Sequence, residues 1–178
     1  METEIRTERL ILRPFRETDY DGLFAFLSQL ESDKFEPYPG ISYENGWEQL
    51  RERVGSKDYF AIELIGTGRV IGNIYCADRP FEAKEVGYIL NEDSRGAGYA
   101  AEALAAVVGN AFSEGAHRVY AECDPRNTPS WRLLERLGFR REAHFRQNVF
   151  SRTDEAGVPK WKDTSVYALL RGEKEAER

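Results

Sequence analysis

The sequence contains few of the residues from which metal sites and disulfide scaffolds are built. Among 178 residues there are two cysteines, Cys76 and Cys123, and two histidines, His117 and His144. Two cysteines that each lie in a strand-like segment are typical of reduced thiols in a cytoplasmic protein. Neither cysteine has a second metal ligand at useful spacing, and the histidines are far apart in sequence, so we expect no metal site.

Long apolar runs and an excess of basic residues are absent as well. No run of about 18 apolar residues occurs, so we expect no membrane span and no membrane partner. The charged N-terminus, METEIRTERL, lacks the apolar region of a secretory signal. Acidic residues outnumber basic ones, 31 to 25, which disfavours nucleic acid as a partner and suits a cationic substrate. With 41% apolar residues, the chain is predicted to fold as one globular domain, residues 1–178.

The most informative stretch is residues 85–139, where the pattern predicts strand, glycine-rich turn, helix, strand, turn and helix. Gly96 and Gly98 allow positive φ angles and a close approach of a ligand to the backbone. The N-terminus of the following helix offers unpaired N–H groups and a positive dipole end, which favour an anion. Apolar residues with helical spacing from Ala100 to Ala111 place a packed helix directly behind the glycines. The turn is therefore predicted to bind phosphate.

Two other interpretations of this turn stay open. It is also compatible with a glycine-rich connector that binds nothing. In addition, Gly96-x-Gly98-x-x-Ala101 fits the loose dinucleotide fingerprint, and Glu122 ends the next strand near the expected position of a ribose-binding acid. Against a dinucleotide fold, the turn lies in mid-chain after several strands, and only one βαβ-like unit follows it.

Hydrophobic patterning predicts the remaining elements. Strands are expected over residues 8–14, 58–65, 69–77, 84–90, 118–123, 140–151 and 162–170. Helices are expected over residues 19–29, with Thr18 as N-cap, near 43–54, after the glycines, and from Thr128 as N-cap, with Pro129 at the first helical position. The charged tail, residues 173–178, is expected to be frayed.

The irregular stretch of residues 31–57 has two interpretations. It combines the aromatic residues Phe35, Tyr38, Tyr43 and Trp47 with several acidic ones. It forms either a packed cap over the sheet or a substrate wall that offers aromatic surface and negative charge to an amine.

Taken in order, these motifs resemble the GNAT acyltransferase superfamily, in the branch similar to the ribosomal-protein-alanine N-acetyltransferases. The motifs that carry the resemblance are TERLILRP (7–14), EVGY (85–88), RGAGYAAEA (95–103), Asn127-x-x-Ser130, LERLGF (134–139), Lys162-Asp163 and Tyr167. The resemblance implies an α+β fold of the α/β/α type. Its mixed, mostly antiparallel central sheet has about seven strands with a V-shaped splay and is flanked by helices.

The resemblance also implies a reaction, in which acetyl-CoA donates an acetyl group to a primary amine by direct attack in a ternary complex. The amine belongs to a protein N-terminus or a small molecule. The expected CoA-binding residues are Ile89 and Leu90 for pantetheine, Asn127 and Ser130 near it, and the backbone of Arg95, Gly96, Ala97, Gly98, Tyr99 and Ala100 for the pyrophosphate. Asp93 departs from the family pattern, because many members have Gln or Arg there.

Catalytic roles are less defined by the resemblance. Glu85 is the candidate base, directly or through a water, or it only positions the amine. A backbone N–H near Ile89 is a candidate to stabilise the oxyanion. Many members have a tyrosine acid where this chain has Leu134, so Ser130 is the nearest matching hydroxyl. Weaker candidates are Tyr167 and Asp163, and a basic set for the nucleotide phosphates, Arg132, Arg136, Arg140 and Arg141.

Two other functions stay open besides the enzyme. These are a non-catalytic CoA-sensing or interaction domain and, less favoured, an NAD-binding domain. The exposed final strands are compatible with a homodimer.

Overall fold

One mixed sheet organises the chain. The computed structural model describes residues 4–31, 35 and 41–176, and within them eight strands pair in the order β1-β2-β3-β4-β5-β6-β8-β7. The strands are β1 (Ile5–Arg6), β2 (Leu10–Arg13), β3 (Tyr59–Leu64), β4 (Val70–Arg79), β5 (Ala83–Leu90), β6 (Arg118–Cys123), β7 (Arg140–Val149) and β8 (Lys162–Leu170). The predicted strands are confirmed, and the two-residue β1 adds an eighth to the expected seven.

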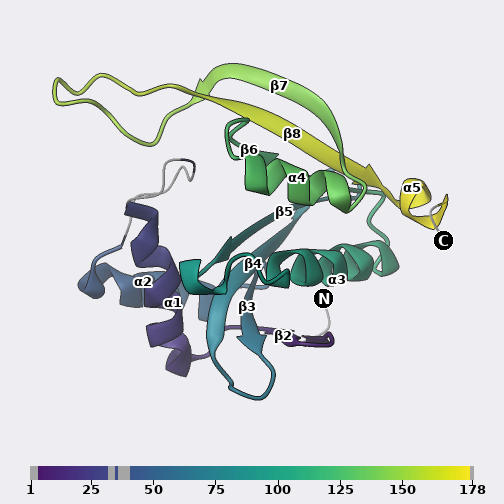
Figure 1. Ribbon diagram of the computed structural model, residues 1–178, viewed down its shortest axis with the longest axis horizontal. Helices are drawn as coiled ribbons and strands as arrows, with labels where there is room; N and C mark the ends of the chain where they lie inside the picture. Colours follow the sequence, from purple (N-terminus) through teal and green to yellow (C-terminus); the bar gives the residue numbers. More distant parts are fainter. Residues whose placement is uncertain (1–3, 32–34, 36–40, 177–178) are drawn as a thin grey trace.

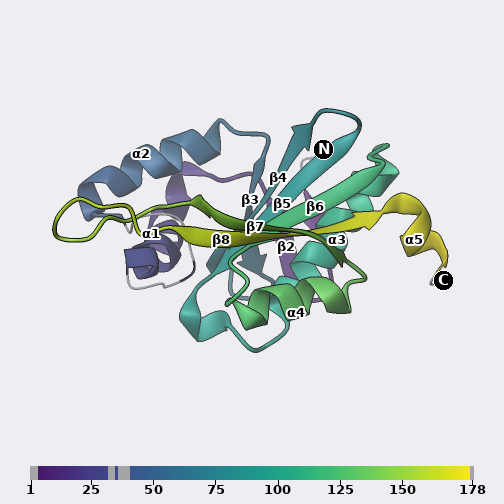
Figure 2. The ribbon, with the colours of Figure 1, turned by 90° about the horizontal axis from the view of Figure 1, so that it is seen from above.

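Helices cover both faces of this sheet (Figures 1 and 2). They are α1 (Tyr20–Leu27), α2 (Tyr43–Val54), α3 (Tyr99–Ser113), α4 (Thr128–Arg136) and α5 (Arg171–Ala176), with short 3-10 turns η1 (Glu17–Asp19), η2 (Ser28–Glu31) and η3 (Glu92–Ser94). The larger core contains Leu104 and Val107 of α3 and Leu134 of α4, and the smaller core contains Leu23 of α1 and Leu50 of α2. The predicted sheet flanked by helices is therefore confirmed.

The strands β5 and β6 are parallel and separate after three pairs. Ala83 pairs with Arg118, Lys84 with Val119 and Glu85 with Tyr120, while the neighbouring strand pairs are antiparallel. Beyond Glu85 and Tyr120 the facing edges of the two strands lack ladder partners within the described residues. This divergence is the V-shaped splay expected from the sequence. It leaves backbone groups of β5 available to a ligand that lies along the strand.

The predicted starts of two helices, α1 and α4, are wrong. Thr18 lies inside η1, and Asp19 precedes α1, where its carboxylate accepts the backbone N–H of Arg16 at 2.7 Å. Asn127, not Thr128, is the N-cap of α4, because its side chain accepts the Ser130 N–H at 3.3 Å, and Pro129 is the second helical residue. An amide oxygen on the longer Asn side chain can satisfy the same orphan donor that a hydroxyl would.

The predicted frayed tail is also wrong as far as Ala176, since α5 is helical there. The Glu173 carboxylate accepts the Leu170 N–H at 3.1 Å, and Arg171 Nε donates to the Ala116 carbonyl at 2.8 Å. These contacts fix the start of α5 against the chain that enters β6.

The β7–β8 hairpin extends beyond the rest of the sheet towards α1 (Figure 1). Near its tip, Arg152 Nη2 donates to the Leu30 carbonyl at 3.1 Å. The hairpin and the end of η2 therefore lie together on the side of the sheet that carries α1 and α2.

Candidate functional site

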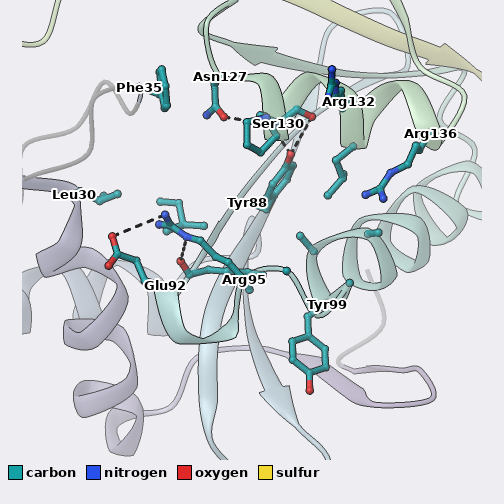
Figure 3. Close-up of a pocket in the computed structure, with 18 residues that line it drawn as sticks. Leu30, Phe35, Tyr88, Glu92, Arg95, Tyr99, Asn127, Ser130, Arg132 and Arg136 are labelled. Atoms are coloured by element: carbon teal, nitrogen blue, oxygen red, sulfur yellow. Dashed lines mark hydrogen bonds and ion pairs between the residues drawn. The ribbon is translucent and has the colours of Figure 1, made fainter.

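A cleft of about 730 Å³ lies at the mouth of the splay, a size typical of sites for small molecules. It is bordered by the end of β5, η3, the start of α3 and one side of α4 (Figure 3). Nine of the predicted site residues line it, namely Ile89, Leu90, Arg95, Gly96, Gly98, Tyr99, Ala100, Asn127 and Ser130. Of the other two, Ala97 belongs to the same turn without lining the cleft, and Glu85 lies elsewhere.

The glycine turn, residues 95–98, presents backbone donors to this cleft. Gly96 and Gly98 have φ angles of 80° and 85°, which residues with a Cβ rarely adopt. The Arg95 N–H donates to the Glu92 carbonyl at 3.2 Å, and the Glu102 N–H donates to the Gly98 carbonyl at 3.1 Å. Between them, the N–H groups of residues 96–101 have no acceptor in the described part of the protein. Such a run at a helix N-terminus favours an anion.

Three arginines add positive charge to the cleft. Arg95, Arg132 and Arg136 line it, and Arg95 Nε donates to the Leu90 carbonyl at 3.2 Å (Figure 3). The other two members of the predicted basic set lie elsewhere. Arg140 forms an ion pair with Glu173 at 3.2 Å, and Arg141 lines a separate cavity of about 430 Å³ with Tyr167.

Tyr88 is a cleft residue that the sequence reasoning did not identify. Its hydroxyl shares a hydrogen bond with the Ser130 hydroxyl at 3.1 Å (Figure 3). Alternation along β5 could have revealed it, because Tyr88 shares a face with Val86 and Leu90, which belong to the larger core. Tyr88 and Ser130 thus bring two hydroxyl groups together between β5 and α4.

Glu85 lies on the opposite face of the sheet and is held by an arginine. Arg79 Nε and Nη2 both contact Glu85 Oε2, at 2.9 and 2.5 Å, and Arg79 Nη2 also donates to the Tyr75 hydroxyl at 2.8 Å. Glu85 therefore has a fixed orientation next to the point where β5 and β6 separate.

A second carboxylate, Glu122, lies near Glu85. It is two residues beyond Tyr120, which pairs with Glu85, so alternation places all three on one face. Desolvation, followed by the charge of Glu85, raises the pKa of Glu122 above its usual value. Desolvation and the charge of Glu85 are also the two largest causes of the raised pKa of Tyr120. From the sequence pattern, Glu122 was expected only as a ribose-binding acid of a dinucleotide site.

The weaker catalytic candidates have other contacts. Asp163 accepts the Gln147 N–H at 2.9 Å and lies 2.8 Å from His144 Nε2, whereas Tyr167 and Leu134 are buried in the larger core. Both cysteines are free thiols. In the part of the chain that the structure describes, no three His, Cys, Asp or Glu residues gather as metal ligands, and no helix is long and apolar enough to cross a bilayer.

Comparison with known proteins shows the family. The model of the acetyltransferase (GNAT) domain matches residues 9–140. The chain belongs to the GNAT acetyltransferase family. A Bacillus licheniformis protein named as an uncharacterized N-acetyltransferase, p20, is 32% identical over 97% of this chain and 98% of its own. The crystal structure of a GNAT-family acetyltransferase from Bacillus anthracis has a TM-score of 0.84 and 31% identity, covering 94% of this chain and 98% of that one.

Two further solved structures share the GNAT fold at lower identity. The ribosomal-protein-S5-alanine acetyltransferase of Vibrio fischeri has a TM-score of 0.77 and 21% identity, covering 95% of this chain and 97% of its own. Mycobacterium smegmatis RimJ, in complex with CoA-disulfide, has a TM-score of 0.73 and 24% identity, covering 92% and 83%. The predicted likeness to ribosomal-protein-alanine acetyltransferases is therefore confirmed at the level of fold, and the protein is an N-acetyltransferase.

Proposed function

We propose that the protein transfers the acetyl group of acetyl-CoA to a primary amine by direct attack in a ternary complex. The observation that carries this proposal is the run of N–H groups at residues 96–101, which opens onto the cleft at the splay. These donors and the three cleft arginines suit the diphosphate of CoA. A CoA-disulfide in the RimJ structure of the same fold supports the choice of ligand.

The remaining cleft residues suit the pantetheine arm. Ile89 and Leu90 lie beyond the last parallel pair with β6. The amides of an extended ligand can therefore hydrogen-bond to the backbone groups of this part of β5, as an added strand would. Asn127 caps α4 and lines the same cleft, which supports a contact with the arm as well. We retain the backbone N–H near Ile89 as the proposed oxyanion donor.

In this proposal, the carboxylates of Glu122 and Glu85 have different roles toward the amine. An ammonium has no lone pair, so the acceptor must lose a proton before it attacks the thioester that acetyl-CoA supplies. We propose Glu122 as the base, because it is exposed on the face that carries Glu85 and its pKa is raised above its usual value. Glu85, bonded twice to Arg79, fits the positioning role. Ser130, whose hydroxyl is shared with Tyr88, is the proposed proton donor to the leaving thiolate.

The acceptor is a primary amine, of a small molecule or a protein N-terminus. Tyr59 and Tyr75, with ring centroids 5.0 Å apart, provide aromatic surface on the face that carries Glu85. Tyr43 and Trp47 instead pack on Tyr20, as a cap over the sheet would, and Tyr38 lies outside the described residues. The structurally similar Vibrio fischeri protein is named a ribosomal-protein-S5-alanine acetyltransferase, which supports protein N-termini as one class of acceptor to test.

A turnover assay tests the proposal. Purified protein is mixed with acetyl-CoA and a panel of amines that includes alanine-starting peptides, polyamines and aminoglycosides, and release of CoA is followed. We expect CoA release that depends on one class of amine. Binding of CoA without turnover on any amine would favour the CoA-sensing alternative, and stabilisation by NAD but not by CoA would favour the dinucleotide alternative.

Three further expectations belong with this proposal. We propose one domain over residues 1–178, and a cytoplasmic location, which the two free thiols support. A homodimer through β7 is also proposed, because this ten-residue strand is at the edge of the sheet. Light scattering on the purified protein measures its mass and tests the dimer.

A further inference from the structure

Two arginines outside the cleft hold the segments on either side of the glycine turn. Arg9 lies just before β2 and contacts the turn and the start of α3, and Arg69 lies just before β4 and contacts η3. Neither residue lines the cleft. Their contacts therefore concern the shape of the turn and not the ligand directly.

Arg9 makes four contacts at the far end of the turn. Its Nη1 donates to the Ala97 carbonyl at 2.9 Å, its Nε donates to Glu102 Oε2 at 2.7 Å, and its backbone N–H donates to Glu102 Oε1 at 2.9 Å. Its guanidinium also lies 4.6 Å from the ring centroid of Tyr99, a ring that points away from Ser130 in Figure 3. One side chain thereby fixes residues 97, 99 and 102.

The carboxylate of Glu102 is held on several sides. The Thr7 hydroxyl donates to its Oε1 at 2.6 Å, next to the Arg9 backbone N–H. Burial by itself would raise the pKa of Glu102, but these hydrogen bonds from Thr7 and Arg9 outweigh it and lower the pKa. The carboxylate therefore stays ionised and available to Arg9 at neutral pH.

Arg69 holds the near end of the turn. Its Nη1 and Nη2 contact the two oxygens of Asp93, each at 3.0 Å, and Nη2 donates to the Ser94 hydroxyl at 2.8 Å. Ser94 is buried and directly precedes the turn. Asp93, which departs from the family pattern, thus serves here as the acceptor for a fork-like arginine pair.

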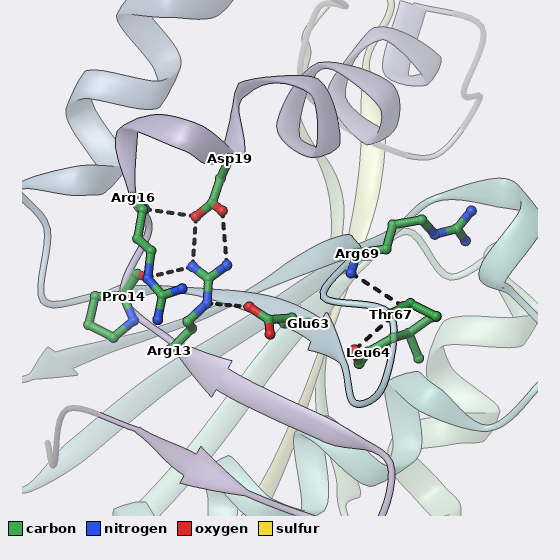
Figure 4. Close-up of polar contacts among 8 residues, drawn as sticks. All are labelled: Arg13, Pro14, Arg16, Asp19, Glu63, Leu64, Thr67 and Arg69. Carbon is green, nitrogen blue, oxygen red and sulfur yellow. Dashed lines mark hydrogen bonds and ion pairs between the residues drawn. The ribbon is translucent and has the colours of Figure 1, made fainter.

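The segments that carry Arg9 and Arg69 are connected through the turn between β3 and β4. The Ile65 N–H, in the turn between β3 and β4, donates to the Arg9 carbonyl at 3.0 Å. In the same turn the Thr67 hydroxyl accepts the Arg69 N–H at 3.3 Å (Figure 4). The segments that carry Arg9 and Arg69 are therefore bonded to each other, and they hold the glycine turn from both ends.

These ion pairs are too exposed to matter much for folding. The side chains are 42% and 50% exposed for Arg9 and Arg69, and pairs of exposed side chains contribute little to stability. A turn with two glycines, however, loses much conformational entropy when it is ordered. Holding it in the binding shape beforehand removes that cost from ligand binding.

We propose that Arg9 and Arg69 are positioning residues that preorganise the glycine turn for the diphosphate of CoA, acting through Glu102 and Asp93. This inference rests on the proposed function, because it takes CoA as the ligand. It predicts that both arginines increase the affinity for ligands that contain the diphosphate and do not affect the rate of the thioester chemistry.

The test compares donors with and without the diphosphate. The variants are Arg9→Gln, Arg9→Lys, Arg69→Gln and Asp93→Asn. Arg6→Gln is the matched control, because Arg6 is exposed on β1 and its side chain contacts nothing in the turn among the described residues. Calorimetry with CoA and with pantetheine measures affinity. Steady-state kinetics with acetyl-CoA and with S-acetyl-pantetheine measures KM and kcat, and thermal melting checks that each variant is folded.

We expect each Arg9 and Arg69 variant to weaken CoA binding and raise the KM for acetyl-CoA about tenfold, with kcat and both pantetheine ligands unchanged. Arg9→Lys should lose as much as Arg9→Gln, because one ammonium cannot hold both Ala97 and Glu102. Unchanged CoA affinity in the variants, equal losses with both donors, or full retention in Arg9→Lys would each overturn the inference. If the wild-type protein binds no CoA, the proposed function itself fails, which the wild-type titration shows before any variant is compared.

Discussion

The guanidinium of Arg79 donates two hydrogen bonds to a single carboxylate oxygen of Glu85, from Nε at 2.9 Å and from Nη2 at 2.5 Å. This contact fixes the orientation of the Glu85 carboxylate beside Arg79. The negative charge of this carboxylate acts on Glu122, where it helps desolvation to raise the pKa. We therefore propose that Glu85 acts as a fixed charge and that Glu122 accepts the proton. Substitution of each of the two is expected to have a different effect.

Glu122→Gln is expected to lower kcat/KM by about 100-fold or more, since general bases contribute on that order. A base must be deprotonated to act, so in the wild type kcat/KM should fall as the pH drops through the pKa of Glu122. Because that pKa is raised from 4.5, the fall should begin at a higher pH than for an ordinary glutamate. The pH profile of kcat/KM measures it. Retention of this acidic limb in Glu122→Gln would contradict the assignment.

Glu85→Gln is expected to move the same acidic limb to lower pH. The substitution removes the charge that is the second cause of the raised pKa of Glu122, so Glu122 should deprotonate more easily. The loss in rate should be smaller than in Glu122→Gln, and it should appear largely in the KM of the amine. If Glu85→Gln abolishes the limb while Glu122→Gln keeps it, Glu85 is the base and the roles are reversed.

Cys76 is expected to resist thiol reagents in the native protein. Burial raises its pKa to about 11, so at pH 8 only about 0.1% is thiolate, the reactive form. The half-buried Cys123 should react first. Titration with a disulfide reagent, in the wild type and in Cys123→Ser, measures this, and the variant should show no fast reaction until it is unfolded. A fast equivalent in native Cys123→Ser would show that Cys76 is accessible.

Gly98→Ala is expected to weaken CoA binding as well as stability. Gly98 has a φ of 85°, and an added Cβ would lie 3.4 Å from Arg9 Nη2. The left-handed conformation alone costs about 1–2 kcal/mol for a residue with a Cβ. Gly115→Ala is the matched control, because Gly115 has a φ of 104° and open space around it. Urea unfolding should show similar losses for both variants, while calorimetry with CoA should distinguish them. Equal CoA affinities would mean that the turn tolerates the change.

Patterns that repeat along the chain made much of the fold predictable. The spacing of Ala100, Leu104 and Val107 placed α3 behind the glycines, and the structure buries Leu104 and Val107 there. The ordered motifs identified the family, and with it the splay between β5 and β6. Helix caps were less predictable because Thr18, Thr128 and their neighbours offer several acceptors within a few residues, and only the folded backbone selects one.

Contacts between distant segments could not be read from the sequence. The hydrogen bond of Tyr88 to Ser130, the contacts of Arg79 with Glu85 and the effect of Glu85 on Glu122 all depend on which strands become neighbours. The raised pKa of Glu122, an exposed residue, likewise depends on desolvation by the folded strands around it and on the charge of Glu85. The sequence therefore predicted the residues that line the cleft better than the contacts among the side chains on the opposite face of the sheet.

The last prediction concerns the buried ion pair beneath α1 (Figure 4). Arg13 contacts both oxygens of Asp19, at 2.7 and 2.9 Å, and its Nε donates to Glu63 at 2.6 Å. The Arg13 and Asp19 side chains are only 5% and 6% exposed, so Asp19→Asn leaves a buried guanidinium with one charged partner.

Asp19→Asn should therefore destabilise the protein by about 3 kcal/mol, as expected when one member of a buried pair is removed. The matched control is Asp93→Asn, the same substitution in a pair whose side chains are about half exposed, where the loss should be under about 1 kcal/mol. Urea unfolding measures both. Equal losses in the two variants would show that burial does not decide how much these pairs contribute to the free energy of unfolding. The same result would remove the basis for treating the Arg69–Asp93 pair as a positioning contact.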